Sequence, residues 1–304
     1  MGVMRMGYVH AKVTDLAEAD QHYSQVMGLY ETAREDGTIY YKGWDEFDHH
    51  SVVIEEGGVG VVKVGFKVRT LEDLAQYETR LQQFGATVER MSAGENLKVG
   101  DGIRFIAPNG HVFELYHEME QVGVEVGTHC PDSFPMDLRG IGAPNLDHGL
   151  FVGDDVEGVE KLFIEALDFY PSERMLATGD DGAPLIATWL SCGNKSHDIA
   201  FLKGPDGKLH HFAFYLKDWN HVTAAADILV HHDTPMDLPP TRHGITRGET
   251  TYFFDPSGNR NETFAGGYLM YPDRPCVEWT MDQLGKGLDY YRREVTPTFL
   301  TVYS

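Results

Sequence analysis

The strongest constraint on how this chain can fold is an internal repeat, because its two halves carry the same series of sequence patterns. Gly7–Tyr30 and Leu146–Tyr170 both read as a short apolar strand, a helix start that contains Asp, an amphipathic helix and a break that leads to Tyr. In the first copy Leu16, Ala19 and Tyr23 recur at three- and four-residue steps, which is the spacing of one helix face. The pattern predicts two similarly folded units.

The next part of the repeat is a change from strand-like to helix-like periodicity. Val64–Thr70 and Phe212–Asp218 alternate in polarity, and the segments that follow them, Leu71–Phe84 and Trp219–Val230, have helical spacing. A period of two followed by a period near 3.6 is typical of a strand that leads into a helix. The two halves therefore predict a strand–helix unit at matching positions.

The repeat closes with a hairpin that carries a glutamate. Arg104–Glu114 and Tyr252–Glu262 each contain Pro followed by Asn-Gly or Ser-Gly, which is tight-turn chemistry, so each glutamate is expected on the returning strand. Lys63 and His211 both lie 51 residues before the glutamate of their own half. Equal spacing between independent landmarks indicates a real duplication.

The length of 304 residues and the hydrophobic share of 42% suit two domains, each with its own core. A stretch rich in Pro and Gly at 131–144 predicts a linker between an N-terminal domain at 1–130 and a C-terminal domain at 145–304. The tail beyond Met281 contains aromatic residues, and it is expected to pack back on the body of the protein.

The charge and the cysteines narrow the class of protein further. A formal charge of −22 argues against nucleic acid as a partner, since phosphates require clustered Lys and Arg. No apolar run approaches the length of a membrane span, so no membrane is expected as a partner. Cys130, Cys192 and Cys276 are widely spaced and odd in number, which favours a reducing compartment over a disulfide framework. We expect a soluble, cytoplasmic protein.

The second copy carries a candidate metal site. His148, His211 and Glu262 occupy points where the first copy has Tyr8, Lys63 and a retained glutamate. A single histidine on an apolar strand is more often a buried core residue, but three such residues in corresponding strands favour ligation. Two imidazoles and one carboxylate leave open positions on Fe(II) or Mn(II), whereas a third imidazole or a thiolate would indicate zinc. We expect the first copy to be metal-free.

For three further polar residues of the second copy, a place in the site is no more expected than a structural role. His197 precedes an apolar strand, His243 lies in a loop that contains Gly, and Tyr252 lies on the hairpin strand paired with that of Glu262.

Other histidines are expected to lie outside the metal site. The pairs His49–His50 and His231–His232 lie in polar turns or at a helix end, and both pairs are expected at the surface. His210 is expected to face away from the side of His211 if the strand is regular.

At these positions the chain resembles the type I extradiol catechol dioxygenases, the catechol 2,3-dioxygenases in particular, of the vicinal oxygen chelate superfamily. Gly248–Glu262, which reads GETTYFFDPSGNRNE, resembles the family signature that ends in a metal-ligating glutamate. Leu146–Gly149 and Leu209–Phe212 resemble the segments of the first and second ligands, and Phe299–Val302 resembles the terminal stretch. The likeness covers essentially the whole chain.

The resemblance implies an α+β fold in which each domain pairs two βαβββ modules into a partial β-barrel. It implies Fe(II), with Mn(II) less expected, held by His148, His211 and Glu262, and it implies His197, His243 and Tyr252 as the catalytic residues around the metal. It also implies that catechol or a substituted catechol reacts with O2, with ring cleavage next to the two hydroxyls to a 2-hydroxymuconate semialdehyde-type product, in a homotetramer that serves aromatic-compound degradation. Residues implied at the pocket wall are Trp189, Leu202, Ile245, Thr246 and Phe299.

Two classes of alternative stay open at this point, other enzymes of the same superfamily and a metal-free binding protein. A glyoxalase-like isomerase that draws ligands from both modules would need His or Glu in place of Tyr8 and Lys63, and a hydroxyphenylpyruvate-type dioxygenase is the other relative on the same fold. A metal-free binding protein would not need three ligands kept in one copy and lost from the other. Bound iron, together with a yellow product from catechol, separates these classes.

Overall fold

The computed structural model describes residues 2–304, and its first half consists of two successive βαβββ modules. The first module comprises β1 (Val3–Val13), α1 (Leu16–Asp20) with the π-helical turn η1 (Gln21–Val26), β2 (Tyr30–Glu35), β3 (Thr38–Lys42) and β4 (Val52–Glu56). The second comprises β5 (Gly60–Val68), α2 (Leu71–Phe84), β6 (Val88–Met91), β7 (Gly102–Ile106) and β8 (Val112–Tyr116).

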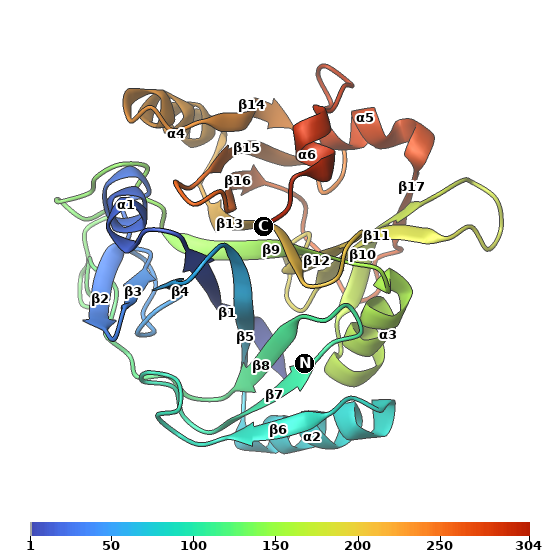
Figure 1. The fold of residues 1–304 in the computed structure, drawn as a ribbon, viewed down its shortest axis with the longest axis horizontal. Coiled ribbons are helices and arrows are strands. Elements are labelled where there is room, and N and C mark those ends of the chain that lie inside the picture. The colour runs from blue at the N-terminus through green and yellow to red at the C-terminus, as the bar shows by residue number, and fades with distance from the viewer. Residues whose placement is uncertain (1) are drawn as a thin grey trace.

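The second half repeats this order and adds a tail (Figure 1). Its first module comprises β9 (Asn145–Gly153), α3 (Val156–Leu167), β10 (Tyr170–Leu176), β11 (Leu185–Ser191) and β12 (Ile199–Lys203). Its second module comprises β13 (Lys208–Tyr215), α4 (Trp219–His231), β14 (Met236–Arg242), β15 (Gly248–Phe254) and β16 (Arg260–Gly266). The tail contains β17 (Val277–Thr280), η2 (Met281–Gln283), α5 (Leu284–Leu288) and α6 (Pro297–Thr301). The α+β fold of paired βαβββ modules is therefore confirmed.

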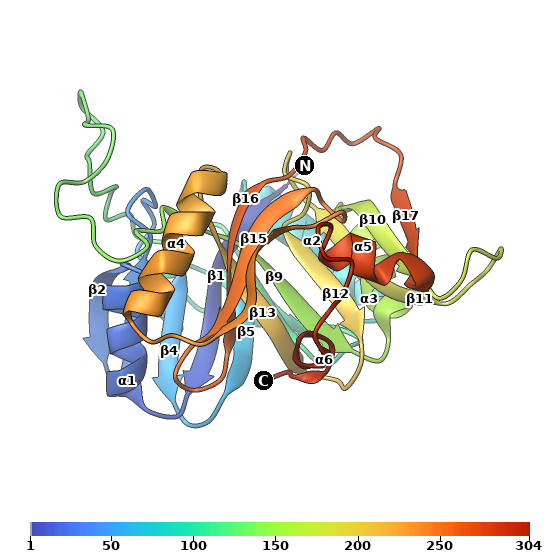
Figure 2. The same ribbon diagram turned by 90° about the horizontal axis from the view of Figure 1, so that it is seen from above.

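Each half forms one curved sheet from both of its modules (Figure 2). The strand orders are β2-β3-β4-β1-β5-β8-β7-β6 and β14-β15-β16-β13-β9-β12-β11-β10-β17. The two modules of a half meet through their first strands, which pair antiparallel, β1 with β5 and β9 with β13. Each first strand also pairs in parallel with the last strand of its own module, as β13 does with β16. This arrangement brings strands that are distant in sequence to the centre of the sheet.

The helix boundaries follow from local capping chemistry. Helix α2 has the predicted bounds: the Thr70 side chain accepts from the backbone N–H of Asp73, and Gly85 ends the helix at φ 101°. Helix α4 begins at an Asp218 cap as the pattern indicates, and it ends at His231, one residue later than predicted. The first helix differs from a regular α-helix, because it widens into a π-helical turn over Gln21–Val26.

Aromatic side chains join the two halves into one core. Phe66 contacts Phe169 with ring centroids 5.5 Å apart, and Phe113 contacts Phe163 at 5.2 Å, both in edge-to-face geometry. All four rings are buried. The sheets are therefore held at a fixed relative position by apolar packing across their junction.

The hairpin turn of each half also docks onto the other half. In one direction the backbone N–H of Gly60 donates to Asn259 Oδ1 at 2.8 Å. In the other direction the backbone N–H of Gly207 donates to the Asn109 carbonyl at 3.0 Å. These contacts reflect the duplication, because each half offers the same turn to its counterpart.

The expectation that His49 and His50 lie at the surface is wrong. Their exposed fractions are 4% and 2%, and the His50 ring meets that of Tyr40 at 5.0 Å. The turn is drawn inward because the His49 N–H donates to the Glu120 carbonyl, in a segment far away in sequence. The other pair, His231–His232, is exposed as expected.

The tail packs back on the body, as its aromatic content indicates. The backbone of Ser304 exchanges hydrogen bonds with that of Leu209 at 2.9 and 3.0 Å, and Phe299 is buried. Tyr290 and Tyr291 nevertheless stay exposed, so only part of the aromatic surface is covered.

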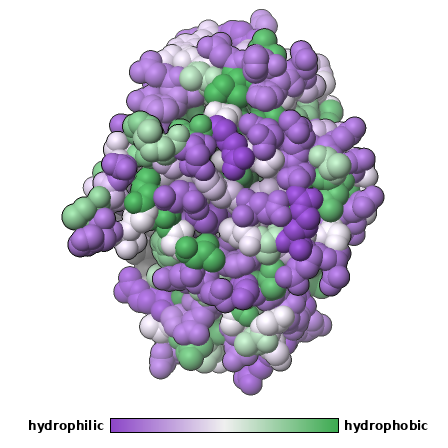
Figure 3. Space-filling view, turned by 90° about the vertical axis from the view of Figure 1, so that its left-hand side faces the viewer, coloured by the Kyte–Doolittle hydropathy of each residue, from purple (hydrophilic) through white to green (hydrophobic). Residues whose placement is uncertain are grey.

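The exterior agrees with the acidic composition. Figure 3 shows one face that is mostly hydrophilic, with apolar side chains scattered over it. Within residues 2–304, the helices are all too short or too polar to span a bilayer.

We expect buried His111 to make the fold sensitive to mild acid. Burial lowers the pKa of His111 to about 4, so the folded protein keeps this imidazole neutral while the unfolded chain protonates it below about pH 6.5. The unfolded state then binds more protons, and stability present at neutral pH is lost as the pH falls from about 6.5 toward the folded pKa. Between pH 7.5 and 5.5, the free energy of unfolding measured in urea should fall by about 1 kcal/mol less for His111→Gln than for the parent. Equal losses in both proteins would contradict this, and His231→Gln is the exposed control.

Candidate metal centre

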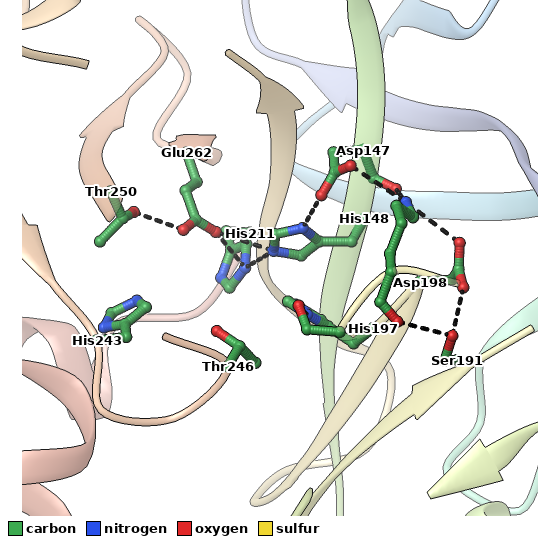
Figure 4. Close-up of polar contacts among 12 residues, drawn as sticks. Asp147, His148, Ser191, His197, Asp198, His211, His243, Thr246, Thr250 and Glu262 are labelled. Carbon is green, nitrogen blue, oxygen red and sulfur yellow. Dashed lines mark hydrogen bonds and ion pairs between the residues drawn. The ribbon is translucent and has the colours of Figure 1, made fainter. Parts of the chain in front are cut away.

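Strand register brings three polar side chains to one point. Ala213 on β13 pairs with His148 on β9 and also with Glu262 on β16, so these three residues face the same side of the sheet. His211 lies two residues before Ala213 and shares that side. The two imidazoles and the carboxylate point toward one another (Figure 4). Predicted convergence of the three residues is therefore observed in the structure.

The spacing of the donor atoms fits one face of an octahedral metal. Glu262 Oε2 lies 3.0 Å from Nε2 of both His148 and His211, and the two nitrogens are 3.4 Å apart. Ligands at right angles on bonds of about 2.1 Å stand about 3 Å from each other. The three atoms form the single group of this kind found within residues 2–304. A metal-binding site is present here.

Neighbouring groups set the tautomer of both imidazoles. His148 Nδ1–H donates to Asp147 Oδ2 at 2.7 Å, which leaves the Nε2 lone pair for a metal. His210 donates from Nε2 to the Phe299 carbonyl at 2.9 Å, so its Nδ1 accepts from His211 Nδ1–H at 2.7 Å. His211 Nε2 is thereby also unprotonated. His210 supports the site without joining the triad, and the strand is not regular there, because a bulge lies between residues 209 and 211.

The charges of the triad favour a cation. Burial raises the pKa of the Glu262 carboxyl, but His148 and His211 outweigh burial and hold that pKa well below its usual range. Burial lowers the pKa of His211 to about 4. Burial also lowers that of His148, but Glu262 and Asp147 raise it to about 9. An anionic carboxylate beside two imidazole nitrogens attracts a divalent ion, and binding of that ion releases the His148 proton.

The other candidate residues lie around the same cavity. His197 lies beside the triad, with its ring centroid 4.0 Å from that of His148. His243 Nδ1–H donates to the Leu288 carbonyl, so its Nε2 accepts from the Tyr252 hydroxyl at 2.8 Å. Burial lowers the pKa of both His197 and His243, which makes each a neutral imidazole at pH 7. All three residues line the cavity at the triad.

The expected wall residues divide between two cavities. Trp189, Ile245, Thr246 and Phe299 line the cavity at the triad. Leu202 does not, because it lies on an adjoining cavity farther along the sheet.

In the first copy, side-chain cations take the position that a metal would need. Gly65 corresponds to Ala213, since it pairs with both Tyr8 and Glu114. Without a side chain at Gly65 the Tyr8 ring lies over the backbone, and its hydroxyl donates to the Glu114 carboxylate. Lys63 Nζ and Arg104 Nε reach the same carboxylate at 3.3 and 2.7 Å. The retained glutamate is thus neutralised without a metal.

Sequence reasoning missed several supporting residues. Thr250 donates to Glu262 Oε1 at 2.5 Å, so the carboxylate keeps only Oε2 free for a metal. Lys195 Nζ lies 3.1 Å from Asp147 Oδ1 and 3.2 Å from Asp198 Oδ1, behind His148. The sequence does carry a signal for Asp147, because a carboxylate next to His148 can orient the imidazole of a metal ligand. The position of Thr250 carries no comparable signal, because it depends on hairpin register.

Family models match both halves of the chain. Residues 63–120 match the catechol 2,3-dioxygenase-like N-terminal domain. Residues 145–263 match the glyoxalase/bleomycin resistance protein/dioxygenase superfamily. The second match contains all three residues of the triad.

Individual relatives agree over nearly the full length. A metapyrocatechase from Pseudomonas sp. (strain CF600) is 42% identical over 99% of this chain and 98% of its own. A manganese-dependent 2,3-dihydroxybiphenyl 1,2-dioxygenase from Geobacillus genomosp. 3 is 29% identical over 97% and 96%. The solved 2,3-dioxygenase LapB from Pseudomonas sp. KL28 has a TM-score of 0.89 at 43% identity, covering 93% of this chain and 99% of its own. A solved mutant of homoprotocatechuate 2,3-dioxygenase from Brevibacterium fuscum has a TM-score of 0.88 at 28% identity, covering 100% of this chain and 82% of its own.

Fold and site together define a metal-dependent oxygenase whose site is built from a duplicated βαβββ unit. The chain belongs to the extradiol ring-cleaving dioxygenases, non-haem metal enzymes of the vicinal oxygen chelate superfamily.

Proposed function

We propose that this protein cleaves the ring of catechol, or of a substituted catechol, next to its two hydroxyl groups with O2. The product is a semialdehyde of the 2-hydroxymuconate type. The observation that carries the proposal is the triad of His148, His211 and Glu262, whose donor atoms stand 3.0 to 3.4 Å apart in a relative of metapyrocatechase. The wider role that follows is degradation of aromatic compounds.

We propose Fe(II) as the metal and the triad as its ligands. The donor set suits Fe(II) and Mn(II) alike, and one relative is described as manganese-dependent, so the choice of iron rests on the family resemblance. When bound, the ion would supply Lewis acidity toward the catechol hydroxyls and redox chemistry between the ring and O2.

The residues around the triad have separate roles in this proposal. His197 is neutral and unpaired at Nε2 among the described contacts, so it accepts a proton beside the reacting oxygen and returns it later. Tyr252 donates to His243, and its oxygen keeps a lone pair that accepts from a substrate hydroxyl. Burial of all three residues excludes water and fixes the orientation of the diol.

Anaerobic loading with Fe(II), followed by catechol and air, tests the proposal. Loaded protein should bind one iron per chain and form a yellow product, whereas protein treated with a chelator should form none until iron is restored. Loading with Mn(II) in a parallel sample compares the two metals. Full iron occupancy without cleavage of any tested catechol would refute the proposed function.

The domain organisation, the cellular compartment and the oligomeric state complete the proposal. The domains are the metal-free 1–130 and the catalytic 145–304, joined by the 131–144 linker. The enzyme is cytoplasmic, which agrees with three cysteines that form no disulfide. It is a homotetramer by resemblance to the family, and light scattering on the purified protein measures this directly.

A further inference from the structure

A buried carboxylate on β10 has no part in the chemistry proposed above. It belongs to Glu173, which is 1% exposed. Its Oε1 accepts from the Thr246 N–H at 2.6 Å and from the Tyr268 hydroxyl at 2.8 Å, and its Oε2 accepts from Trp279 Nε1 at 2.5 Å. This side chain thus ties β10 to three other segments, which are the loop after β14, the residues after β16 and strand β17.

The loop that receives one of these hydrogen bonds is strained. Thr246 and Arg247 both have φ of 59°, in the left-handed region that residues with a side chain seldom adopt. The conformation is especially unfavourable for Thr246, because its side chain is branched at Cβ. A strained conformation persists only where its surroundings fix it, and the backbone N–H of Thr246 is fixed by Glu173 Oε1.

The indole on the other carboxylate oxygen supports the same loop from a second side. A Cβ built on Gly244 would lie 3.0 Å from Trp279 Cη2, so the indole packs directly on the backbone of Gly244. The Gly244 N–H also donates to the Gly287 carbonyl at 2.9 Å, which holds the start of the loop independently. Glu173 therefore fixes the loop directly at Thr246 and through the indole at Gly244.

This loop forms part of the metal cavity. His243, Ile245 and Thr246 line that cavity, whereas Glu173 does not. His243 also accepts from the Tyr252 hydroxyl at 2.8 Å, and this pair meets the substrate oxygens in the proposed function. A shift of the loop would move groups that contact a bound diol. It would leave the metal ligands in place, because they lie on β9, β13 and β16.

We propose that Glu173 is a positioning residue, which holds residues 243–247 in the shape that binds the diol. The inference rests on the proposed function and adds to it a residue that acts from outside the cavity. Glu173 acts through the backbone of Thr246 and through the Trp279 indole, without contact with substrate or metal.

A carboxylate is required at this position, because two of its three partners can only donate. An amide offers one acceptor oxygen and one NH2 group. In one orientation the NH2 group of Gln would face the Trp279 indole N–H, and in the other it would face the Thr246 N–H. Either orientation leaves a buried donor without a partner, at one of the two points where the loop is held.

In Glu173→Gln, the KM for catechol should rise about tenfold, because binding of the diol must then also restore the loop. The dissociation constant of catechol for the iron-loaded enzyme without O2 should rise by a similar factor. Iron content should stay at one per chain, and kcat should stay within about twofold of the parent, since binding and not chemistry is impaired.

Glu160 supplies the matched control, since its carboxylate is also buried and also bonded to the same sheet. It accepts from Arg174 Nε at 2.8 Å and from the Thr188 hydroxyl at 2.6 Å, away from the metal cavity. Both Glu160→Gln and Glu173→Gln should melt earlier than the parent, but only Glu173→Gln should raise KM. The same KM in both variants would overturn the inference while cleavage by the parent stands. Absence of cleavage by the parent would overturn the proposed function and the inference with it.

Tyr268→Phe tests the same contact if Glu173→Gln does not fold. The change removes one donor to Oε1 but keeps the ring over which Arg247 and Arg274 lie, at 5.3 and 4.0 Å from its centroid. KM for catechol should rise about threefold with iron content unchanged. A KM equal to that of the parent in Tyr268→Phe would overturn the inference equally.

Discussion

Replacing Glu262 with Gln is expected to abolish metal binding and ring cleavage together. An amide oxygen at this position carries no charge, and its N–H group faces either the metal position or the Thr250 hydroxyl. We expect metal affinity to fall by more than about 100-fold and cleavage of catechol to fall by at least about 1,000-fold. Metal analysis after dialysis and steady-state kinetics measure the two effects.

The first copy offers a matched control for this experiment. Glu114 is the corresponding glutamate, but Lys63 and Arg104 occupy its carboxylate. Glu114→Gln should therefore lower the melting temperature, because it leaves the largely buried Lys63 without its anion, while Arg104 keeps Glu95 at 2.9 Å. It should keep the metal content and the rate. Retained iron in Glu262→Gln would remove this residue from the ligand set.

The second large effect is expected for His197→Ala, in which the rate falls but the metal stays. The imidazole of His197 lies beside the triad, not within it, so its removal takes away a proton acceptor without removing a ligand. General acid–base groups contribute about 100- to 10,000-fold, and we expect a loss of kcat in that range. Iron content should remain near one per chain.

Added imidazole distinguishes lost chemistry from lost packing. The small side chain of Ala leaves space next to His148, and an imidazole that enters this space should restore part of kcat. The rescue should grow with pH as more of the imidazole becomes neutral. Parallel loss of iron and rate, without rescue, would assign His197 to the support of the metal instead.

Much of the architecture was predictable from local patterns. The strand–helix switches at Val64–Phe84 and Phe212–Val230 predict β5–α2 and β13–α4, because periodicity and caps act over a few residues. The two glutamate hairpins are found at the predicted turns. Local patterns did not reveal the widening of the first helix into a π-helical turn, nor the inward fold of His49 and His50. Both segments contact residues far along the chain, since His22 and Tyr23 of the π-helical turn bond Asn261 and Asp255 and the His49 N–H donates to the Glu120 carbonyl.

The sequence alone determined which chemical groups the site contains, because ligand type is a property of side chains and the duplication sets their equivalent positions. It therefore identified His148, His211 and Glu262 as the candidate ligands, and it showed that other residues replace the two histidines in the first copy. Only the tertiary structure decided how these groups meet, since strand register placed Ala213 between an imidazole and a carboxylate. The support by Asp147 and Thr250 belongs to the same category. Each depends on distances between strands that no local pattern encodes.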